Sequence, residues 1–187
     1  QYASASSGSV LQLVMELVSK WQTIPPISFV NSFHDNAQMI EIFAENGAKY
    51  QPETFDHILF SFHGLPERQI RKGSVDGYCQ LSDKCCGNYT KKNQFCYRGQ
   101  CFHTTRLLAA KLGLPEEKVM TCFQSRLGKD PWIKPYTEDI IKELAEKGIK
   151  KVLVFSPAFV ADCLETTVEV GEEYKEEFEE LGGEKWD

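Results

Sequence analysis

The length, charge and apolar content of the chain exclude several classes of protein. It has 187 residues, of which 42% are hydrophobic, and this suits one ordinary globular domain with a single core. The net charge of −6 and the lack of clustered Lys and Arg argue against nucleic acid as a partner. The apolar runs are far shorter than the roughly 20 residues of a transmembrane helix, so we expect no membrane-spanning segment.

The cysteines and the start of the chain favour a reducing compartment. Residues 1–8 are small and polar, unlike the basic and then apolar start of a secretory signal. The seven cysteines are an odd number, so reduced thiols or metal ligands explain them better than a disulfide framework does. We therefore expect a cytoplasmic protein. The first residue is Gln1 rather than Met, as in a fragment of a longer protein.

Alternating strand and helix patterns predict an α/β fold. Short apolar runs rich in β-branched and aromatic residues lead through polar loops into helical patterns, which is typical of a parallel sheet buried on both faces. We predict an open four-stranded parallel sheet flanked by helices, of the flavodoxin or Rossmann type. The predicted strands are Ile27–Ser32, Ile58–Phe62, Val119–Phe123 and Val152–Phe155. The predicted helices are Ser9–Trp21, Asn36–Asn46, Phe102–Leu112, Thr137–Lys147 and Leu164–Leu181.

His63 is the first candidate for chemistry, because it directly follows a predicted strand. Ligands of open parallel sheets bind beyond the carboxyl ends of the strands. Gly64 permits close approach and Pro66 stiffens the loop, so the imidazole would be held rigidly to accept a proton or bind a metal ion. The alternative is a loop histidine bonded to the backbone. That structural interpretation is the one we give to the other histidines, His34, His57 and His103.

The helix after the fourth predicted strand carries a second candidate. Glu165, Glu169 and Glu173 recur at four-residue steps, which places three carboxylates on one face of an α-helix. Such a row could pass cations or protons towards the start of the helix. The alternative is a solvated acidic face, since the whole helix is acidic.

A polar segment between Pro66 and Phe102 is too long for an ordinary connection and holds five of the seven cysteines. Four thiolates suffice for a [2Fe-2S] cluster or a tetrahedral zinc ion. The absence of paired CxxC motifs favours the iron–sulfur cluster. We interpret Cys122 and Cys163 as small buried residues. The candidate ligands are Cys79, Cys85, Cys86, Cys96 and Cys101.

The loop after the third predicted strand suits the wall of a cleft. It contains polar residues, two cations and an indole that could receive a flat ligand with carboxylates. The alternative is that Trp132 simply packs on the next helix. The candidate residues are Gln124, Ser125, Arg126 and Trp132.

The chain resembles the ferrochelatase family from end to end, because it contains four of the family's motifs in the same order. Gln1–Ser9 is similar to the family's Q-Y-S-x-S-T-x-G-S segment, and Ser61–Pro66 to its S-x-H-G-[IL]-P signature. Phe123–Trp132 resembles its x-Q-S-[RK]-x-G-x-x-P-W stretch, and Phe159–Thr166 its F-x-[AS]-D-x-[IL]-E-T motif. These segments favour ferrochelatase over chelatases for other tetrapyrroles.

The resemblance implies a lyase that inserts Fe(II), its substrate, into protoporphyrin IX or coproporphyrin III to make haem. His63 and Glu165 would be the catalytic pair, and burial would raise the pKa of the carboxylate. Glu169 and Glu173 would continue a path for iron or protons. The porphyrin cleft would include Gln124, Ser125, Arg126, Trp132 and Phe159.

The resemblance also implies that residues 1–187 are the C-terminal lobe of a two-lobed chelatase, with a cysteine-rich insert at about 67–101. The partners would be porphyrin, ferrous iron, the missing N-terminal lobe and, through peripheral contact, the inner membrane. The fragment alone would be inactive.

The cysteine insert distinguishes this chain within the resemblance. Ser4 stands where animal members have a cluster-binding Cys, whereas some bacterial members hold [2Fe-2S] through four cysteines of an internal segment. Because adjacent residues rarely face one cluster together, Cys85 or Cys86 would be the spare. The competing interpretations are an iron–sulfur module in which the cluster is the function, and a chelatase for another tetrapyrrole.

Overall fold

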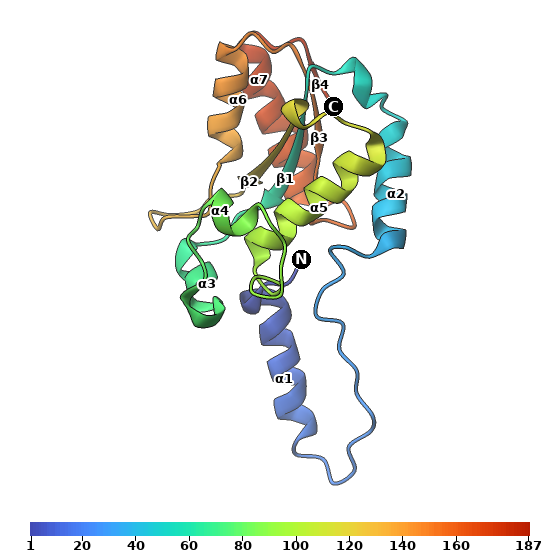
Figure 1. Ribbon diagram of the computed structural model, residues 1–187, viewed down its shortest axis with the longest axis vertical. Coiled ribbons are helices and arrows are strands. Elements are labelled where there is room, and N and C mark those ends of the chain that lie inside the picture. Colours follow the sequence, from blue (N-terminus) through green and yellow to red (C-terminus); the bar gives the residue numbers. More distant parts are fainter.

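The computed structural model describes residues 1–187, apart from the side chain of Val75, and shows one parallel sheet between two layers of helices (Figure 1). The strands are β1 (His57–His63), β2 (Val119–Gln124), β3 (Lys151–Phe155) and β4 (Lys185–Trp186). Their order is β2-β1-β3-β4, and all neighbouring pairs are parallel. The predicted α/β fold with an open four-stranded parallel sheet is confirmed.

The helices connect and flank these strands. The α-helices are α1 (Ser9–Val18), α2 (Ala37–Ala48), α3 (Glu67–Lys72), α4 (Asp83–Cys86), α5 (Tyr97–Leu112), α6 (Thr137–Glu146) and α7 (Tyr174–Glu180). π-Helices span Ser4–Gly8 and Glu165–Glu173, and 3-10 turns span Pro52–Thr54 and Glu116–Lys118. In Figure 1, α1 and the extended chain that follows it project away from the sheet.

Alternate residues of β1 face the two helical layers. Ile58, Phe60 and Phe62 are fully buried in a core shared with α2 and α5. Leu59 is fully buried in a second core shared with α6 and α7. Burial of both faces is why this strand is almost continuously apolar. The central strand therefore carries His63 to the carboxyl edge of the sheet on a rigid support.

One of the predicted strands is wrong. Ile27–Ser32 is extended but pairs with no strand among the described residues, and Val30 is 77% exposed. Strand-forming residues mark a fit to a half-buried pleated surface, and this segment has no neighbour to supply one. The fourth strand is instead Lys185–Trp186, whose two residues are too few to give a periodic pattern.

Two predicted helices differ in extent or type. The helix predicted over Phe102–Leu112 begins at Tyr97, because the thiol of Cys96 accepts the backbone N–H of Gly99 and caps it. The helix predicted over Leu164–Leu181 is a π-helix that continues as α7. Within the described residues, no helix combines the length and apolar character that a membrane span requires.

Candidate active site and cysteine segment

His63 ends β1 at the carboxyl edge of the sheet, opposite Gln124 of β2. Its Nδ1 lies 2.7 Å from the carbonyl oxygen of Gly64. A carbonyl can only accept a hydrogen bond, so Nδ1 carries the proton and Nε2 keeps a free lone pair. The hydroxyl of Tyr97 donates to the carbonyl of His63 over 2.7 Å and steadies the backbone. The half-buried imidazole is thus held in the tautomer that can accept a proton or a metal ion at Nε2.

Gly64 allows Trp132 to pack beside this imidazole. A methyl group at Gly64 would lie 2.9 Å from the carbonyl oxygen of Gln124 and 3.0 Å from the indole of Trp132. The ring centroids of Trp132 and His63 are 6.2 Å apart. Among the described residues, the buried indole Nε1 finds no hydrogen-bond partner. Trp132 therefore forms a flat wall next to His63, and its indole N–H is left without a hydrogen-bond acceptor in the part of the chain that the structure describes.

The acidic row lies on the π-helix Glu165–Glu173 rather than on an α-helix. Hydrogen bonds from i to i+5 wind more residues into each turn than in an α-helix. A four-residue step then falls slightly short of a full turn instead of slightly beyond it. Glu165, Glu169 and Glu173 consequently stay close to one face, although the helix type was not predicted.

Glu165 differs electrostatically from the expectation. A hydrogen bond to its own backbone N–H, followed by a side-chain hydrogen bond with Cys163 and attraction to His63, lowers its pKa. Burial contributes little, so the expected rise in the pKa of a buried carboxyl group is wrong. Glu165 is a carboxylate at neutral pH, and His63 is close enough to act on its charge.

Glu169 is tied down by four hydrogen bonds. Its carboxylate accepts the backbone N–H of Ser125 over 2.7 Å and the hydroxyl of Ser125 over 2.5 Å. It also accepts from the amide of Gln124 over 3.1 Å and from the hydroxyl of Tyr174 over 2.9 Å. Ser125 has a positive φ of 62°, and this network holds it there. Glu169 therefore fixes the loop after β2, while Glu173 is exposed.

The predicted cleft residues have unequal positions. Gln124 is only 1% exposed. Its amide oxygen accepts the hydroxyl of Ser61 and its amide nitrogen donates to the carbonyl of Glu165, so it holds the strand and the π-helix together beneath the site. Arg126 is exposed and lies over the ring of Tyr136, 4.5 Å from its centroid. Phe159 lines a hollow of about 940 Å³ between α2, β3 and the π-helix. Neither His63 nor Glu165 is among the residues that line that hollow.

Four cysteines of the cysteine segment (residues 67–101) line one hollow of about 140 Å³, namely Cys79, Cys85, Cys86 and Cys96. The sulfurs of Cys85 and Cys86 lie 3.7 Å apart. Two thiolates on one metal ion at bonds of about 2.3 Å would lie at nearly that separation. Both thiols therefore border the same hollow, and which of the five cysteines is the spare one stays a prediction.

Cys101 has a different environment. It is fully buried in the core shared by β1, α2 and α5, and it is not among the residues that line the 140 Å³ hollow. Burial raises the pKa of its thiol well above the usual value. Of the five candidate ligands, Cys101 is the one that stands apart.

The cysteine sulfurs are not gathered around a single metal position. Within the described residues, the group of potential ligand atoms that all lie within 4.8 Å of one another consists of His34, Asp35 and His103. A mononuclear zinc site needs four sulfurs in one shell, whereas a binuclear cluster takes two at each iron. The 3.7 Å between the sulfurs of Cys85 and Cys86 suits two ligands of one iron, and the described residues contain no larger group of cysteine sulfurs within 4.8 Å of one another.

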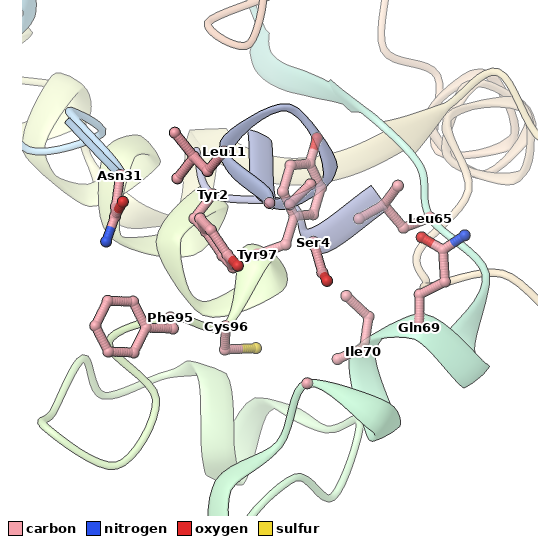
Figure 2. Close-up of a pocket in the computed structure, with 13 residues that line it drawn as sticks. Tyr2, Ser4, Leu11, Asn31, Leu65, Gln69, Ile70, Phe95, Cys96 and Tyr97 are labelled. Carbon is pink, nitrogen blue, oxygen red and sulfur yellow. The ribbon is translucent and has the colours of Figure 1, made fainter. Parts of the chain in front are cut away.

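A second hollow of about 400 Å³ borders the cysteine segment and is shown in Figure 2. Tyr2 and Ser4 from the start of the chain, Ile70 of α3, and Phe95 and Cys96 lie around it. The N-terminal segment therefore meets the cysteine segment, through α3 and through Phe95 and Cys96, at one cavity that adjoins the thiol of Cys96.

Several buried polar residues of α5 were missed by sequence reasoning. Gln100 is 0% exposed; its Oε1 accepts the backbone N–H of Tyr2 over 2.6 Å and its Nε2 donates to the carbonyl of Gln94 over 2.6 Å. Arg98 is 4% exposed, and its guanidinium pairs with Asp83 over 3.1 Å. The sequence signal that could have revealed them is an arginine and a glutamine close to cysteines directly before a predicted helix. Such residues are rarely buried without partners.

Taken together, these features define an α/β protein with an imidazole and a carboxylate at the carboxyl edge of a parallel sheet, a combination suited to moving protons or metal ions. The ferrochelatase family model matches residues 1–187. The chain is 45% identical over 186 residues to a ferrochelatase of Legionella pneumophila (strain Corby), covering 100% of this chain and 55% of that protein. It is 40% identical over 186 residues to a ferrochelatase of Pseudomonas fluorescens biotype C, covering 99% and 55% respectively.

The chain therefore belongs to the ferrochelatase family, and the resemblance drawn from its motifs is confirmed. It spans about half the length of the curated relatives it matches.

Proposed function

We propose that the protein containing this chain is a ferrochelatase that inserts Fe(II) into a porphyrin to form haem. The observation that carries the proposal is the tautomer of His63: Nδ1 is occupied by the carbonyl of Gly64, so Nε2 is free to accept a proton. Membership of the family supports the same activity.

The reaction needs a base and a group that handles the metal. As one Fe(II) dication enters, the porphyrin loses two N–H protons, and the total charge is conserved. We assign the first acceptance to Nε2 of His63 and the second to Glu165, which is ionised and can guide Fe(II); its lowered pKa makes it a weak base that passes the proton on to solvent. Glu173, exposed on the same helix, would receive ions from solvent. Glu169, with its four hydrogen bonds, would mainly keep the helix and the loop in register.

The porphyrin would lie against the wall formed by Trp132, with Arg126 and Ser125 on the same loop and Phe159 on the loop before the π-helix. A planar macrocycle can stack on an indole, and its carboxylates can pair with a guanidinium. Gln124 would support this wall rather than touch the porphyrin, since it is buried.

Substitution in the whole enzyme tests the catalytic pair. His63→Ala and Glu165→Gln should each lower the rate of metal insertion by about 100-fold or more, as expected for loss of a general base. Glu172→Gln, which changes an exposed carboxylate on the same helix, should leave the rate within about twofold. Near-normal rates for either of the first two variants would refute the assignment.

We further propose that Cys79, Cys85, Cys86 and Cys96 hold a [2Fe-2S] cluster and that Cys101 is the spare cysteine. Arg98 supports the fit: its buried Nη1 finds no partner in the described part of the chain, and Cys86 is close enough to interact with the guanidinium. A cluster with four thiolates is anionic and would satisfy that cation. When bound, it would cross-link a segment that has little core of its own.

Anaerobic purification with visible spectroscopy and with iron and sulfide analysis tests this cofactor. Ser substituted for any of the four proposed ligands should abolish the cluster spectrum, whereas Cys101→Ala should keep it. Cys163→Ser is the matched control outside the segment. Loss of the cluster in Cys101→Ala with retention in Cys85→Ser would overturn the ligand assignment.

The activity is proposed for the whole protein rather than for these 187 residues. Helix α1 leaves Val10 60%, Leu13 56% and Leu17 52% exposed, and such a surface calls for a partner. We propose that the rest of the protein covers it and completes the porphyrin cleft, so the 187-residue polypeptide alone should show no turnover. The seven cysteines, all free, favour a cytoplasmic location.

A further inference from the structure

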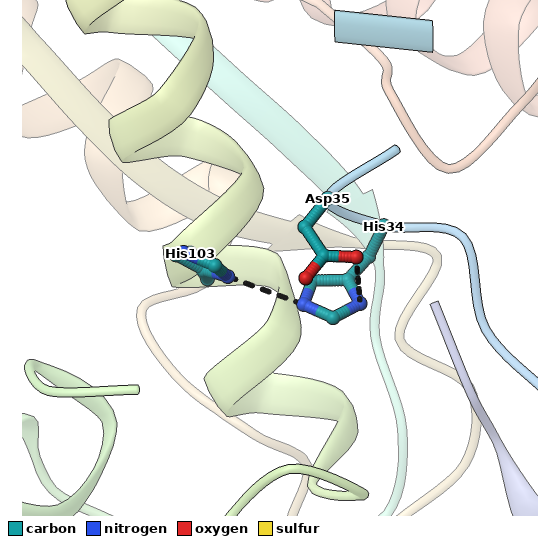
Figure 3. Close-up of side chains that lie close together, drawn as sticks. All are labelled: His34, Asp35 and His103. Atoms are coloured by element: carbon teal, nitrogen blue, oxygen red, sulfur yellow. Dashed lines mark hydrogen bonds and ion pairs between the residues drawn. The ribbon is translucent and has the colours of Figure 1, made fainter. Parts of the chain in front are cut away.

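A pair of histidines lies beside the cysteine segment and outside the proposed active site (Figure 3). His34 belongs to the loop before α2, and His103 belongs to α5. Nε2 of His34 lies 3.2 Å from Nδ1 of His103. Oδ1 of Asp35 lies 3.7 Å from Nδ1 of His34, and one ligand atom from each of the three residues falls within 4.8 Å of the other two.

We propose that His34, His103 and Asp35 form a binding site for a divalent first-row transition-metal ion such as zinc or Fe(II), separate from the catalytic pair and from the cysteine hollow. Two imidazoles and one carboxylate form a donor set that such ions prefer. Magnesium, which prefers oxygen ligands, would not compete for it.

The spacing of the two nitrogens supports a shared ion. Two nitrogens bound to one tetrahedral metal at about 2.05 Å are separated by roughly 3.3 Å. The observed 3.2 Å between Nε2 of His34 and Nδ1 of His103 is almost the same. The rings would therefore need little movement to bind the ion. Asp35 would need to rotate towards it, which is easy because its side chain is 49% exposed.

A chain of hydrogen bonds fixes the tautomer of His34. Gln100 Oε1 accepts the backbone N–H of Tyr2, which sets the orientation of the amide. The hydroxyl of Ser32 donates to the same Oε1 over 3.1 Å, so its oxygen is left to accept Nδ1–H of His34 over 2.8 Å. Nε2 of His34 then keeps its lone pair and points at His103. Metal-binding histidines are commonly oriented by such a hydrogen bond from the other ring nitrogen.

Binding does not require either ring to change its charge. Without a metal, the contact between the rings is a hydrogen bond in which Nδ1–H of His103 donates to Nε2 of His34. When the ion binds, the proton of His103 moves to its Nε2, which lies on a half-buried side chain, and Nδ1 becomes a ligand. Both imidazoles remain neutral, and the carboxylate of Asp35 supplies the negative charge.

The site would join the cysteine segment to the loop before α2. Tyr89 of the segment stacks on His103 with centroids 4.3 Å apart and meets the ring of His34 edge-on at 5.0 Å. Thr104 donates to the carbonyl of His34 over 2.9 Å. An ion held here would therefore limit movement of residues 32–36 relative to Tyr89.

Zinc binding to the intact protein, purified with its cysteine segment unchanged, tests the proposal. Equilibrium dialysis should show one more bound zinc per chain in the wild type than in His103→Ala. Asp35→Asn should weaken binding by about 10-fold or more, in keeping with loss of a ligand. His57→Gln, a change at a histidine far along the sheet, should leave the number of bound zinc ions the same, and millimolar magnesium should not displace the ion.

A crystal soaked in zinc and measured at the zinc absorption edge locates the ion. An anomalous peak between the two ring nitrogens that is absent in His103→Ala supports the proposal. Equal zinc numbers in wild type and His103→Ala, or a peak that lies only at the cysteines, would overturn it. None of these measurements uses haem synthesis, so the outcome is independent of the proposed enzyme activity.

Discussion

The carboxyl edge of the sheet and the cysteine segment satisfy their buried polar groups in different ways. At the edge, Gln124 and Glu169 exchange hydrogen bonds with Ser61, Ser125 and Tyr174, so a buried network closes on itself. In the cysteine segment, a buried arginine nitrogen lacks a partner and four thiols face one small hollow. Apart from the indole Nε1 of Trp132, the first region satisfies its buried polar groups within the protein, whereas the second leaves a cationic nitrogen unpaired, among the residues that the structure describes, beside four thiols.

Removal of iron should produce the largest difference in local stability between the two regions. If a cluster cross-links the cysteine segment, chelation should speed amide exchange in residues 79–95 by about 1,000-fold, or roughly 4 kcal/mol of local stability. Amides of β1 and β2 should keep their protection. The control is Cys86→Ser, in which chelation should change nothing further; equal loss of protection in the strands would show that the regions are not separate.

Glu169→Ala should break the closed network at the edge of the sheet. The backbone N–H of Ser125 and the amide of Gln124 would lose a charged acceptor, which should lower the free energy of unfolding by about 2–3 kcal/mol. Urea unfolding followed by circular dichroism measures this. Glu173→Ala, on the same helix but exposed, should change it by less than about 0.5 kcal/mol. Similar values for the two variants would contradict the anchoring role of Glu169.

Gly64→Ala should disturb the wall beside His63 by a smaller amount. The new methyl group would meet a backbone oxygen at 2.9 Å, which cannot move as a flexible side chain can. We expect a loss of about 1–2 kcal/mol on unfolding and a shift of the indole fluorescence of Trp132. Gly73→Ala is the matched control, because its methyl group would lie 3.5 Å from the nearest atom. An unchanged spectrum for Gly64→Ala would show that the wall can adjust.

The smallest expected effect is the pH dependence of stability caused by His57, which lies at the other end of β1 from His63. Burial, and next the nearby Lys147, lower the pKa of His57. As pH falls below the ordinary value of about 6.5, the unfolded chain takes up a proton before the folded one does. The wild type should therefore lose up to about 1 kcal/mol of stability between pH 7.5 and 5.5 relative to His57→Gln. Parallel pH profiles for the two proteins would show that His57 is not responsible.

The parts of this molecule that could be predicted from sequence are those with a periodic pattern or a fixed motif. β1, β2 and β3 were found because burial on both faces makes a strand continuously apolar. His63 was placed at a strand end because Gly64 and Pro66 mark the turn. The strand predicted at Ile27–Ser32 failed for the complementary reason, since its residues suit a sheet but no neighbouring strand is present.

The features that sequence did not reveal depend on contacts distant along the chain. His34 and His103 are 69 residues apart, and their shared contact arises only when the loop before α2 packs on α5. The lowered pKa of Glu165 depends on a hydrogen bond to its own backbone and on the thiol of Cys163, which no spacing rule describes. The π-helix was missed because its acidic residues fit an α-helical step almost equally well.

The position of β1 in the middle of the sheet has a consequence for how activity should fail on warming. Paired with β2 on one side and β3 on the other, β1 belongs to the part of the molecule that opens last. The π-helix that carries Glu165 buries only Val170 and follows a loop in which Val160 and Leu164 are mostly exposed. Heat would therefore displace the carboxylate of Glu165 while the imidazole of His63 stays in place, so the activity we propose would be lost below the temperature at which the sheet melts.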